Sequence, residues 1–522
     1  MAGTVDLTAV LQARDRRSAK RKKLLAEKGR CLLSVTLLMP GTVKTTKLSR
    51  AFLREYCSYL RKQLQGQNIC ISGEEALADP AGDSYFFVFS AETNPVALKK
   101  TAMLLETEFA WSRALDLDLY LSDGRQLSRS DLDLPERSCL ICSEQAHVCS
   151  RSRRHSIIEL QNKIQQFQAD GLRQLLPERM QSSALAAAFS ELLVAPKPGL
   201  VTGTDAGSHA DMDRFTYADS TAALAGYFGS AAGCGLAEAL RRKSAAETAA
   251  AKDEAADFVE IVSKLHFEGM RAERLMFAAS HGVNTQKGFI YLAGIVLAAA
   301  ASLALEPQVF AFRFKKESEH SVTELWQKEI SRWTAALHKI QAALPAGQET
   351  AGKRIQRLYG ISGVRGEAAS GLATVFQLSL PFYRGLRRRK LAKNEAAATT
   401  LLLLLAATDD TNLINRAGLN RTRLIQKELV EFFEKLSQSE GYFPEQLQIN
   451  SSSGDQVTGK PKLMAADVLT ADCLDNVAAR ESSVISYIEQ WDDYFKENGY
   501  SPGGAADLLA VCFLVLELLS DI

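Results

Sequence analysis

The sequence predicts a multidomain protein, with a mixed α/β (α+β) domain at the N-terminus and an all-α helical domain at the C-terminus. The chain has 522 residues, more than a single domain of about 100–150 residues requires. Short apolar segments alternate with amphipathic ones before residue 170, whereas long alanine-rich segments with helical periodicity dominate afterwards. We expect the two domains to span residues 1–175 and 176–522.

The first domain begins with a basic segment. Residues 5–30 have the periodicity of an amphipathic helix and carry nine Lys or Arg between Leu11 and Arg30. Two interpretations stay open: a solvated helix face, or an arm that attracts phosphates or an acidic partner protein. The segments that follow predict strands over 31–39, 69–72, 84–89 and 115–121, with helices over 47–65 and 95–108.

Two aspartates alternate with leucines in the last of these strands. On a strand, Asp116 and Asp118 share one face while the leucines point to the other. Neighbouring carboxylates repel each other unless a cation lies between them, and many nucleotidyltransferases hold Mg²⁺ against a triphosphate in this way. Two interpretations stay equally open for this pattern: a nucleotidyltransferase-like first domain, or a polar, solvent-facing strand edge.

A cysteine-rich segment follows the strand. Cys139, Cys142, His147 and Cys149 have a C-x₂-C-x₄-H-x-C spacing, and these four soft ligands could close a tetrahedral zinc site. The alternative is a cysteine-rich turn, which would leave the basic residues after it to meet phosphate oxygens, notably Arg151 and His155.

The second domain is predicted to consist of helices joined by polar loops. The helical patterns cover 220–242, 245–278, 288–305, 321–344, 396–405, 421–439 and 482–497. Residues 288–305 form an uncharged segment that is long enough for a membrane span. Their alanine and glycine content favours a buried core helix instead. Residues 446–470 fit no motif and are interpreted as a surface loop.

The loop over 196–215 concentrates chemical groups. Its prolines and glycines predict a shaped, non-helical backbone. His209, Asp211 and Asp213 place one imidazole and two carboxylates within five residues, which suits a divalent ion that carries a polyphosphate, and Lys197 adds a cation. The alternative is a capped turn, with Asp211 or Asp213 at the N-cap of the next helix.

Four further loops have the same polar, glycine-punctuated character: 282–288, 363–371, 409–416 and 501–507. Each alone could be a helix cap. Together with the first loop they supply cations for phosphates and carboxylates for metal binding or proton transfer: Lys197, Lys287, Arg365, Arg416, Asp211, Asp213, Glu367, Asp410 and Asp507. This set indicates a nucleoside triphosphate site without a Walker-type loop.

The composition excludes several classes of protein. With 46% hydrophobic residues and a formal net charge of +1, the chain is neither disordered nor built to bind nucleic acid. The chain has nine cysteines and no secretory signal, which predicts reduced thiols and a cytoplasmic protein. Since 288–305 is interpreted as a core helix, we expect no contact with a membrane.

The motifs resemble those of two enzyme families. Over about 183–520, the segments Pro-Lys-Pro-Gly-Leu-Val, Gly-Ser-His-x-Asp-Met-Asp, Gly-Val-Asn-Thr-x-Lys-Gly, Gly-x-Arg-Gly-Glu, Asp-Thr-Asn and Ser-Pro-Gly-Gly-x-Ala-Asp are similar to triphosphoribosyl-dephospho-CoA synthases. Over about 6–167, Met-Pro-Gly before Lys44, Arg113 before Asp116-Leu-Asp118, and the cysteine-rich segment resemble apo-citrate lyase phosphoribosyl-dephospho-CoA transferase. The chain is thus similar to a fusion of both.

The resemblance implies two consecutive reactions. ATP and 3′-dephospho-CoA would give 2′-(5″-triphosphoribosyl)-3′-dephospho-CoA and adenine, and phosphoribosyl-dephospho-CoA would then pass to a serine of the apo acyl carrier protein (gamma) subunit of citrate lyase, with release of pyrophosphate. We expect catalytic roles for Asp116, Asp118, Arg113, Lys44, Asp211 and Glu367. Substrate contacts are expected from Lys197, His209, Asn284, Lys287, Arg365, Asn412, Arg416, Arg151 and His155. Mg²⁺ ligands are expected at Asp116, Asp118, Asp211, Asp213 and Asp410.

Five positions depart from the family patterns: Phe109, Ser112, Thr202, Gln286 and Ala417. Because a histidine and an aspartate are replaced near the expected site, a non-catalytic nucleotide-sensing or carrier-protein scaffold stays as an alternative. The equivalent enzyme for malonate decarboxylase is a second alternative, and the linked Cys/His segment favours citrate lyase over it.

Overall fold

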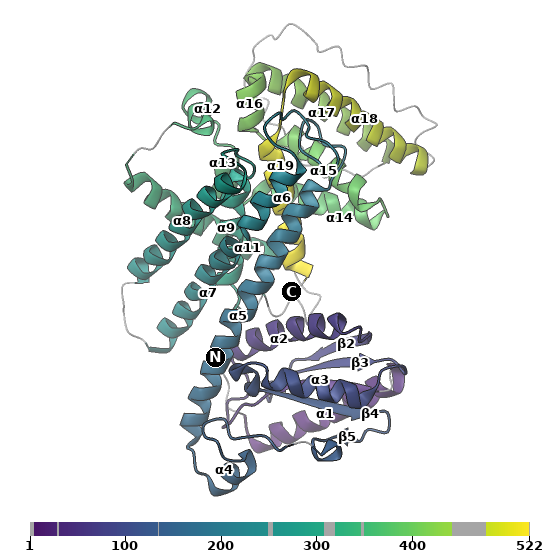
Figure 1. Cartoon of the computed structure of the whole chain (residues 1–522), viewed down its shortest axis with the longest axis vertical. Coiled ribbons are helices and arrows are strands. Elements are labelled where there is room, and N and C mark those ends of the chain that lie inside the picture. Colours follow the sequence, from purple (N-terminus) through teal and green to yellow (C-terminus); the bar gives the residue numbers. More distant parts are fainter. Residues whose placement is uncertain are drawn as a thin grey trace. The chain divides into compact units, whose positions relative to one another are not determined.

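The computed structural model describes residues 5–28, 31–133, 135–248, 254–306, 309, 319–345, 349–440 and 477–520. The chain divides into two compact units: unit 1 comprises 1–178, 304–319 and residue 522, and unit 2 comprises 179–303 and 320–521 (Figure 1). A continuous helix, α5 (Ile157–Leu192), runs from one unit into the other. No break in secondary structure therefore marks the boundary predicted at 175/176, which stays a prediction. The surface loop predicted over 446–470 lies outside the described residues.

Unit 1 is built on a five-stranded antiparallel sheet in the order β2-β3-β1-β4-β5. The strands are β1 (Cys31–Leu37), β2 (Ile71–Leu77), β3 (Ser84–Phe89), β4 (Leu115–Leu121) and β5 (Gln126–Leu127). Three strand predictions are confirmed. The strand predicted over 69–72 was placed too early, because β2 continues through Glu74 and Glu75. Charged residues count against a strand in sequence patterns, so this part of β2 was missed. Their carboxylates are neutralised by ion pairs with Arg61 and Lys20.

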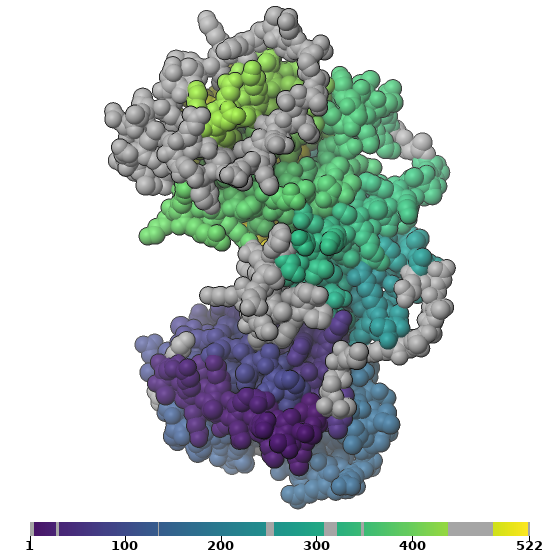
Figure 2. All heavy atoms as spheres, turned by 180° about the vertical axis from the view of Figure 1, so that it is seen from behind, coloured from purple at the N-terminus to yellow at the C-terminus, as the bar shows by residue number. Residues whose placement is uncertain are grey.

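Helices cover both faces of the sheet. On one face, Leu33, Phe87 and Leu117 pack in a core with residues of α2 (Lys47–Gly66) and α3 (Pro95–Thr107). On the other face, Leu32 and Phe86 pack against residues of α1 (Leu7–Lys28). Figure 2 shows α1, in the darkest purple, exposed along the outside of unit 1. The basic N-terminal helix is therefore a layer of the fold.

The remaining short elements of unit 1 are η1 (Ala110–Ala114), η2 (Ser130–Leu132) and α4 (Ala146–Ser152). The described part of unit 2 is helical. Its elements after α5 are α6 (Arg214–Ala223), α7 (Ala225–Thr248), α8 (Glu254–Ala279), α9 (Lys287–Ser302), α11 (Glu319–Ala343), α12 (Ala351–Tyr359), α13 (Val364–Ala369), η3 (Val375–Ser379), α14 (Leu380–Arg388), α15 (Lys393–Ala407), α16 (Thr411–Ala417), α17 (Leu419–Glu440), α18 (Val477–Asn498) and α19 (Gly503–Ser520).

The apolar segments of unit 2 form its core. Most residues of α9, α15 and α19 are buried, and the burial of α9 confirms the core helix predicted over 288–305. Close approach of α7 and α9 depends on glycine, since a Cβ on Gly235 would lie 2.0 Å from the carbonyl oxygen of Ala298. Within the described residues, no helix is long and apolar enough to cross a membrane.

The helix predicted over 220–242 is wrong in its bounds, and the one predicted over 245–278 begins too early, because α7 continues to Thr248 and α8 begins at Glu254. Residues 220–242 were expected as one helix, but α6 already begins at Arg214 and ends before Leu224, where α7 takes over. The early start is caused by Asp213, whose Oδ1 accepts hydrogen bonds from the backbone N–H groups of Phe215 and Thr216 and so caps α6.

Candidate functional site

Two cavities in unit 2 collect the loops that the sequence singled out. The smaller, cavity A, has a volume of about 280 Å³, and the larger, cavity B, about 520 Å³. The charged and polar walls of cavity A are formed by Glu191, His209, Asp211, Tyr217, Asn284, Thr285, Gln286, Lys287, Asn412, Asn415, Arg416, Ser501 and Asp507. Six predicted site residues, from loops as far apart as residues 209 and 416, therefore line one cavity.

The loop before α6 is fixed against the segment before α19. Gly199 has a φ of +64°, and a Cβ there would lie 2.1 Å from the carbonyl oxygen of Tyr500, so only glycine fits. His209 forms a hydrogen bond of 2.9 Å between Nε2 and Ser501 Oγ. Burial, followed by the charge of Arg416, lowers the pKa of His209, which favours the neutral imidazole.

A buried ion pair supports the floor of cavity A. Lys197 is 1% exposed, and its ammonium lies 2.5 Å from Oε1 of Glu191 and 2.8 Å from the carbonyl oxygen of the same residue. Tyr217 donates a hydrogen bond of 3.0 Å to the other carboxylate oxygen of Glu191. Lys197, predicted to touch substrate, is thus turned toward Glu191 and does not line the cavity.

Asp507 contributes the most perturbed carboxyl group of cavity A. Desolvation, and then the nearby charges of Asp410 and Glu191, raise the pKa of Asp507 well above its ordinary value. A raised pKa favours the protonated form of a carboxyl group, which is the form that can act as an acid. The sequence placed Asp507 only in the general set of carboxylates for metal binding or proton transfer, and it did not single out Glu191.

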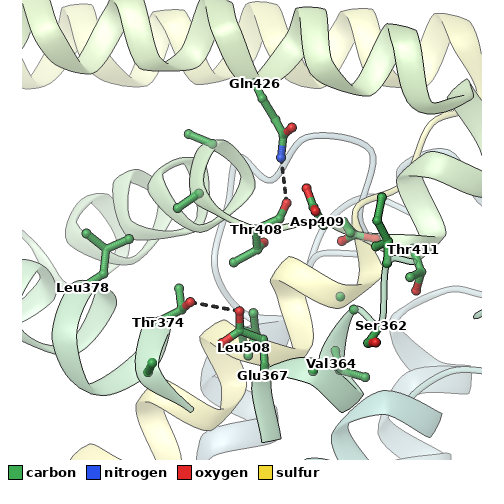
Figure 3. A pocket seen from close by; sticks show the side chains of 18 of the residues that line it. Ser362, Val364, Glu367, Thr374, Leu378, Thr408, Asp409, Thr411, Gln426 and Leu508 are labelled. Carbon is green, nitrogen blue, oxygen red and sulfur yellow. Dashed lines mark hydrogen bonds between the residues drawn. The ribbon is translucent and has the colours of Figure 1, made fainter. Parts of the chain in front are cut away.

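Cavity B lies around Glu367 (Figure 3). The hydroxyl of Thr374 donates a hydrogen bond of 2.9 Å to Oε1 of Glu367. Among the described residues, the buried Oε2 of Glu367 has no partner. Desolvation raises the pKa of this carboxyl group, which the bonds from Thr374 oppose. A carboxylate oxygen without a partner at a cavity wall can accept a proton from a ligand, or a hydrogen bond from a hydroxyl group of the ligand.

Three other predicted residues of unit 2 have structural partners. Asp410 is the N-cap of α16, and its two carboxylate oxygens accept backbone hydrogen bonds of 2.8 Å from Asn412 and Ala505. Asp213 caps α6, which is the alternative left open for it. Arg365 donates to the side chain of Gln341 and lines neither cavity.

In unit 1, the alternation on β4 is confirmed. Leu115, Leu117 and Leu119 are buried, while Asp116 and Asp118 are half-buried on the other face. Burial, followed by the charge of Asp116, raises the pKa of Asp118 to about 6. Repulsion between the two carboxylates thus adds to the effect of burial, and a divalent cation between them would relieve this repulsion. Arg137 Nη2 lies 3.3 Å from Asp116 Oδ1.

A small cationic cavity, cavity C, lies in the same unit and has a volume of about 170 Å³. Its wall includes Lys44 together with Arg14 and Arg17 of α1. Burial, followed by the charges of Arg14 and Arg17, lowers the pKa of Lys44. The two arginines stand out in the sequence only as part of a basic helix.

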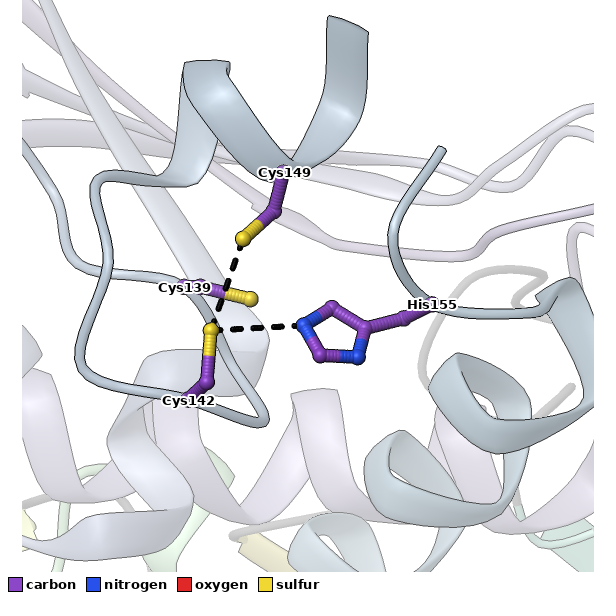
Figure 4. Close-up of side chains that lie close together, drawn as sticks. All are labelled: Cys139, Cys142, Cys149 and His155. Atoms are coloured by element: carbon purple, nitrogen blue, oxygen red, sulfur yellow. Dashed lines mark hydrogen bonds between the residues drawn. The ribbon is translucent and has the colours of Figure 1, made fainter. Parts of the chain in front are cut away.

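The cysteine segment brings together a different set from the predicted one. Sγ of Cys139, Cys142 and Cys149 and a ring nitrogen of His155 lie within 4.8 Å of one another (Figure 4). His147, the predicted fourth ligand, instead pairs with Glu136 at 2.5 Å. Arg151 is exposed on α4, so it is accessible for the phosphate contact expected of it.

Arg113 and the family departures have structural surroundings. Arg113 donates to backbone oxygens of Ser138 and Cys139, so it fastens the cysteine segment. Phe109 stacks on Trp111 at 4.8 Å. Of the other departures, Ser112 is buried and Ala417 is the last residue of α16. The hydroxyl of Thr202 accepts a hydrogen bond from the backbone N–H of Asp205. The side chain of Gln286 donates a hydrogen bond of 2.6 Å to the hydroxyl of Thr221.

Comparisons with known proteins match both halves of the chain. Residues 5–170 match the family model for apo-citrate lyase phosphoribosyl-dephospho-CoA transferase, called CitX, and residues 177–521 match that for ATP:dephospho-CoA triphosphoribosyl transferase, called CitG.

Curated relatives give the same division. The chain is 27% identical to "Protein CitXG" of Haemophilus influenzae over 515 residues. The matched region covers 98% of this chain and 96% of the relative. It is 31% identical to "Protein CitXG" of Leuconostoc mesenteroides subsp. cremoris, over 79% of this chain and 84% of the relative. A "Probable 2-(5″-triphosphoribosyl)-3′-dephosphocoenzyme-A synthase" of Vibrio cholerae is 31% identical over 66% of this chain and 89% of its own length.

Proposed function

The chain belongs to the CitXG family of fused proteins, and from this membership we propose that one polypeptide both makes the citrate lyase prosthetic-group precursor and attaches it. It is a transferase with two activities. The substrates are ATP, 3′-dephospho-CoA and the apo acyl carrier protein subunit of citrate lyase. We assign the enzyme to the cytoplasm, where ATP is available. The activities are divided between residues 1–175 and 176–522.

The first reaction takes place in unit 2. The 2′-hydroxyl of 3′-dephospho-CoA attacks the anomeric carbon of the ATP ribose, a C–O bond forms, and the C–N bond to adenine breaks. Adenine leaves with the bonding electron pair and takes up a proton, while the hydroxyl loses one to a base. The enzyme must therefore supply an acid, a base and positive charge for the triphosphate.

Cavity A has groups for each of these tasks. Lys287 and Arg416 line it and would bind the triphosphate, with Asn284, Asn412 and His209 as further contacts. Asp507, with its raised pKa, is the proposed acid for adenine. Asp211 lines the cavity and is the proposed ligand for an Mg²⁺ ion that would offset phosphate charge when bound. The single observation that carries the assignment is this meeting of six predicted residues beside the buried carboxyl group of Asp507.

Cavity B is the proposed site of the second substrate. The first turn of α19 contributes to both cavities, since Gly503 lines cavity A and Gly504 lines cavity B. Substrates in the two cavities could therefore react beside this turn. Glu367, whose Oε2 has no partner among the described residues, is the proposed base for the attacking hydroxyl.

The second reaction takes place in unit 1, which we propose to be nucleotidyltransferase-like. The serine hydroxyl of the carrier protein attacks the α-phosphorus of the first product and a P–O bond forms. The P–O bond to pyrophosphate breaks, pyrophosphate leaves with the bonding electron pair, and the serine proton passes to a base. Asp116 and Asp118 would hold Mg²⁺, which supplies charge compensation when bound. Lys44, Arg14 and Arg17 of cavity C suit the phosphates of the same substrate.

Replacement of Asp116 by Asn tests the division of labour. The variant should lose carrier-protein loading, measured by mass spectrometry, and should still release adenine from ATP and 3′-dephospho-CoA. Loading at the wild-type rate would refute the metal site on β4.

A further inference from the structure

The cysteine segment of unit 1 places four metal-binding side chains around one point. Cys139 and Cys142 lie on the loop before α4, Cys149 lies on α4, and His155 follows that helix (Figure 4). Sγ of Cys142 lies 3.4 Å from Sγ of Cys149 and 3.3 Å from Nε2 of His155. We propose that Cys139, Cys142, Cys149 and His155 bind one Zn²⁺ ion, and that His147 takes no part.

The donor set and its spacing select zinc. Three thiolates and one imidazole are the ligands of a closed, tetrahedral structural zinc site. Bonds of about 2.3 Å to zinc place two sulfurs about 3.8 Å apart, close to the 3.4 Å between Cys142 and Cys149. All four ligand atoms lie within 4.8 Å of one another, so small side-chain rotations suffice for binding. Because the four ligands leave no open position, the ion has no direct part in chemistry.

Hydrogen bonds and an ion pair connect the cysteine segment to β4 and its aspartates. Arg113, which lies in η1 just before β4, donates to the carbonyl oxygen of Cys139. Arg137, two residues before Cys139, donates to the carbonyl oxygen of Leu115 at 3.1 Å and contacts Asp116 at 3.3 Å. The ion therefore fixes the segment that places Arg137 beside Asp116. This positioning role rests on the proposed transferase function, whereas the metal site itself does not.

Metal content tests the site without reference to activity. The full chain is produced with added zinc and kept under reducing conditions. Its zinc content is then measured by elemental mass spectrometry. We expect about one zinc per chain, and cobalt substitution should give the thiolate-to-cobalt and d–d absorption bands of a tetrahedral sulfur site. A wild-type chain without stoichiometric zinc, or one whose mass shows a disulfide in its place, would overturn the proposal.

Matched variants distinguish the two histidines. Cys142→Ser and His155→Ala should reduce the zinc content at least about tenfold, because each removes one of four ligands. His147→Ala, in the same segment, and Cys70→Ser, at an exposed cysteine outside the cluster, should keep it. Retention of zinc by Cys142→Ser, or its loss in His147→Ala but not in His155→Ala, would contradict the assignment.

The positioning role needs a separate measurement. Cys142→Ser should lower carrier-protein loading while adenine release by unit 2 continues, and a far-UV circular dichroism spectrum equal to that of the wild type shows that unit 1 has folded. Normal loading by a zinc-free chain would refute the positioning role. If the wild-type chain binds zinc but catalyses neither reaction, the proposed function fails while the metal site stands.

Discussion

The carboxyl group of Asp507 lies directly against the Cα of Gly288, and a Cβ on Gly288 would come within 1.8 Å of Asp507 Oδ2. A glycine at the start of α9 thus allows a carboxyl group from α19 to reach the wall of cavity A. The relationship joins the first turns of two helices that lie more than two hundred residues apart in the sequence, and it supports the role of Asp507 as the acid in the first reaction.

Gly288→Ala should reduce adenine release at least about tenfold, because displacement of a general acid removes a catalytic contribution of about 10²–10⁴. The measurement is chromatography of adenine formed from ATP and 3′-dephospho-CoA. Gly233→Ala is the matched control, since a Cβ at that position meets nothing within 4 Å. Equal losses in both variants would contradict the account, as would none in Gly288→Ala.

Asp507→Asn should separate activity from stability. Because the native pKa of Asp507 is raised, the native state holds a proton that the unfolded chain loses above the ordinary aspartate pKa of about 4. The stability contributed by this group is full below that pH and falls as the pH rises toward the raised native pKa. The variant should therefore lose adenine release, yet unfold at an equal or higher temperature than the wild type at pH 8, by thermal denaturation. A large drop in melting temperature at pH 8 would mean that Asp507 is ionised and paired.

Lys197→Met should destabilise unit 2 without a change specific to substrate binding. Glu191 would be left as a buried, unpaired charge, which costs about 3–5 kcal/mol, and both side chains are almost fully buried. Adding Glu191→Gln should restore part of the stability, because the remaining charge is removed. Thermal unfolding of the two variants measures this coupling. A stable Lys197→Met protein with a raised KM for ATP would show instead that Lys197 meets the nucleotide.

Arg14→Gln and Arg17→Gln should each raise the KM for the triphosphoribosyl substrate in carrier-protein loading by about tenfold, since one charge-assisted hydrogen bond contributes about 1.5 kcal/mol or more. Lys22→Gln removes the same charge from an exposed position of α1 and is the control. Loading kinetics with supplied precursor measure the effect. If all three variants behave alike, α1 acts through its overall charge and cavity C is not a phosphate site.

Local patterns predicted a good part of this protein. The alternation of Asp116 and Asp118 with buried leucines follows from the two-residue period of a strand, and α9 and α15 follow from long uncharged alanine-rich segments. Such features depend only on neighbours in the chain.

Features that depend on distant contacts were missed. Spacing favoured His147 for the cysteine cluster, but the turn after α4 brings His155 back to the thiols instead. Lys197 looks like a phosphate ligand in the sequence, and only the tertiary structure buries it against Glu191. The raised pKa of Asp507 also requires the packing of three separate segments around it.

The central claim is that one chain makes the prosthetic-group precursor and attaches it. The most direct measurement is mass spectrometry of the apo acyl carrier protein after incubation with this protein, ATP, 3′-dephospho-CoA and Mg²⁺, with adenine followed in the same tube. The account predicts a mass gain of one phosphoribosyl-dephospho-CoA unit together with free adenine. An unmodified carrier protein, with or without adenine, would contradict it.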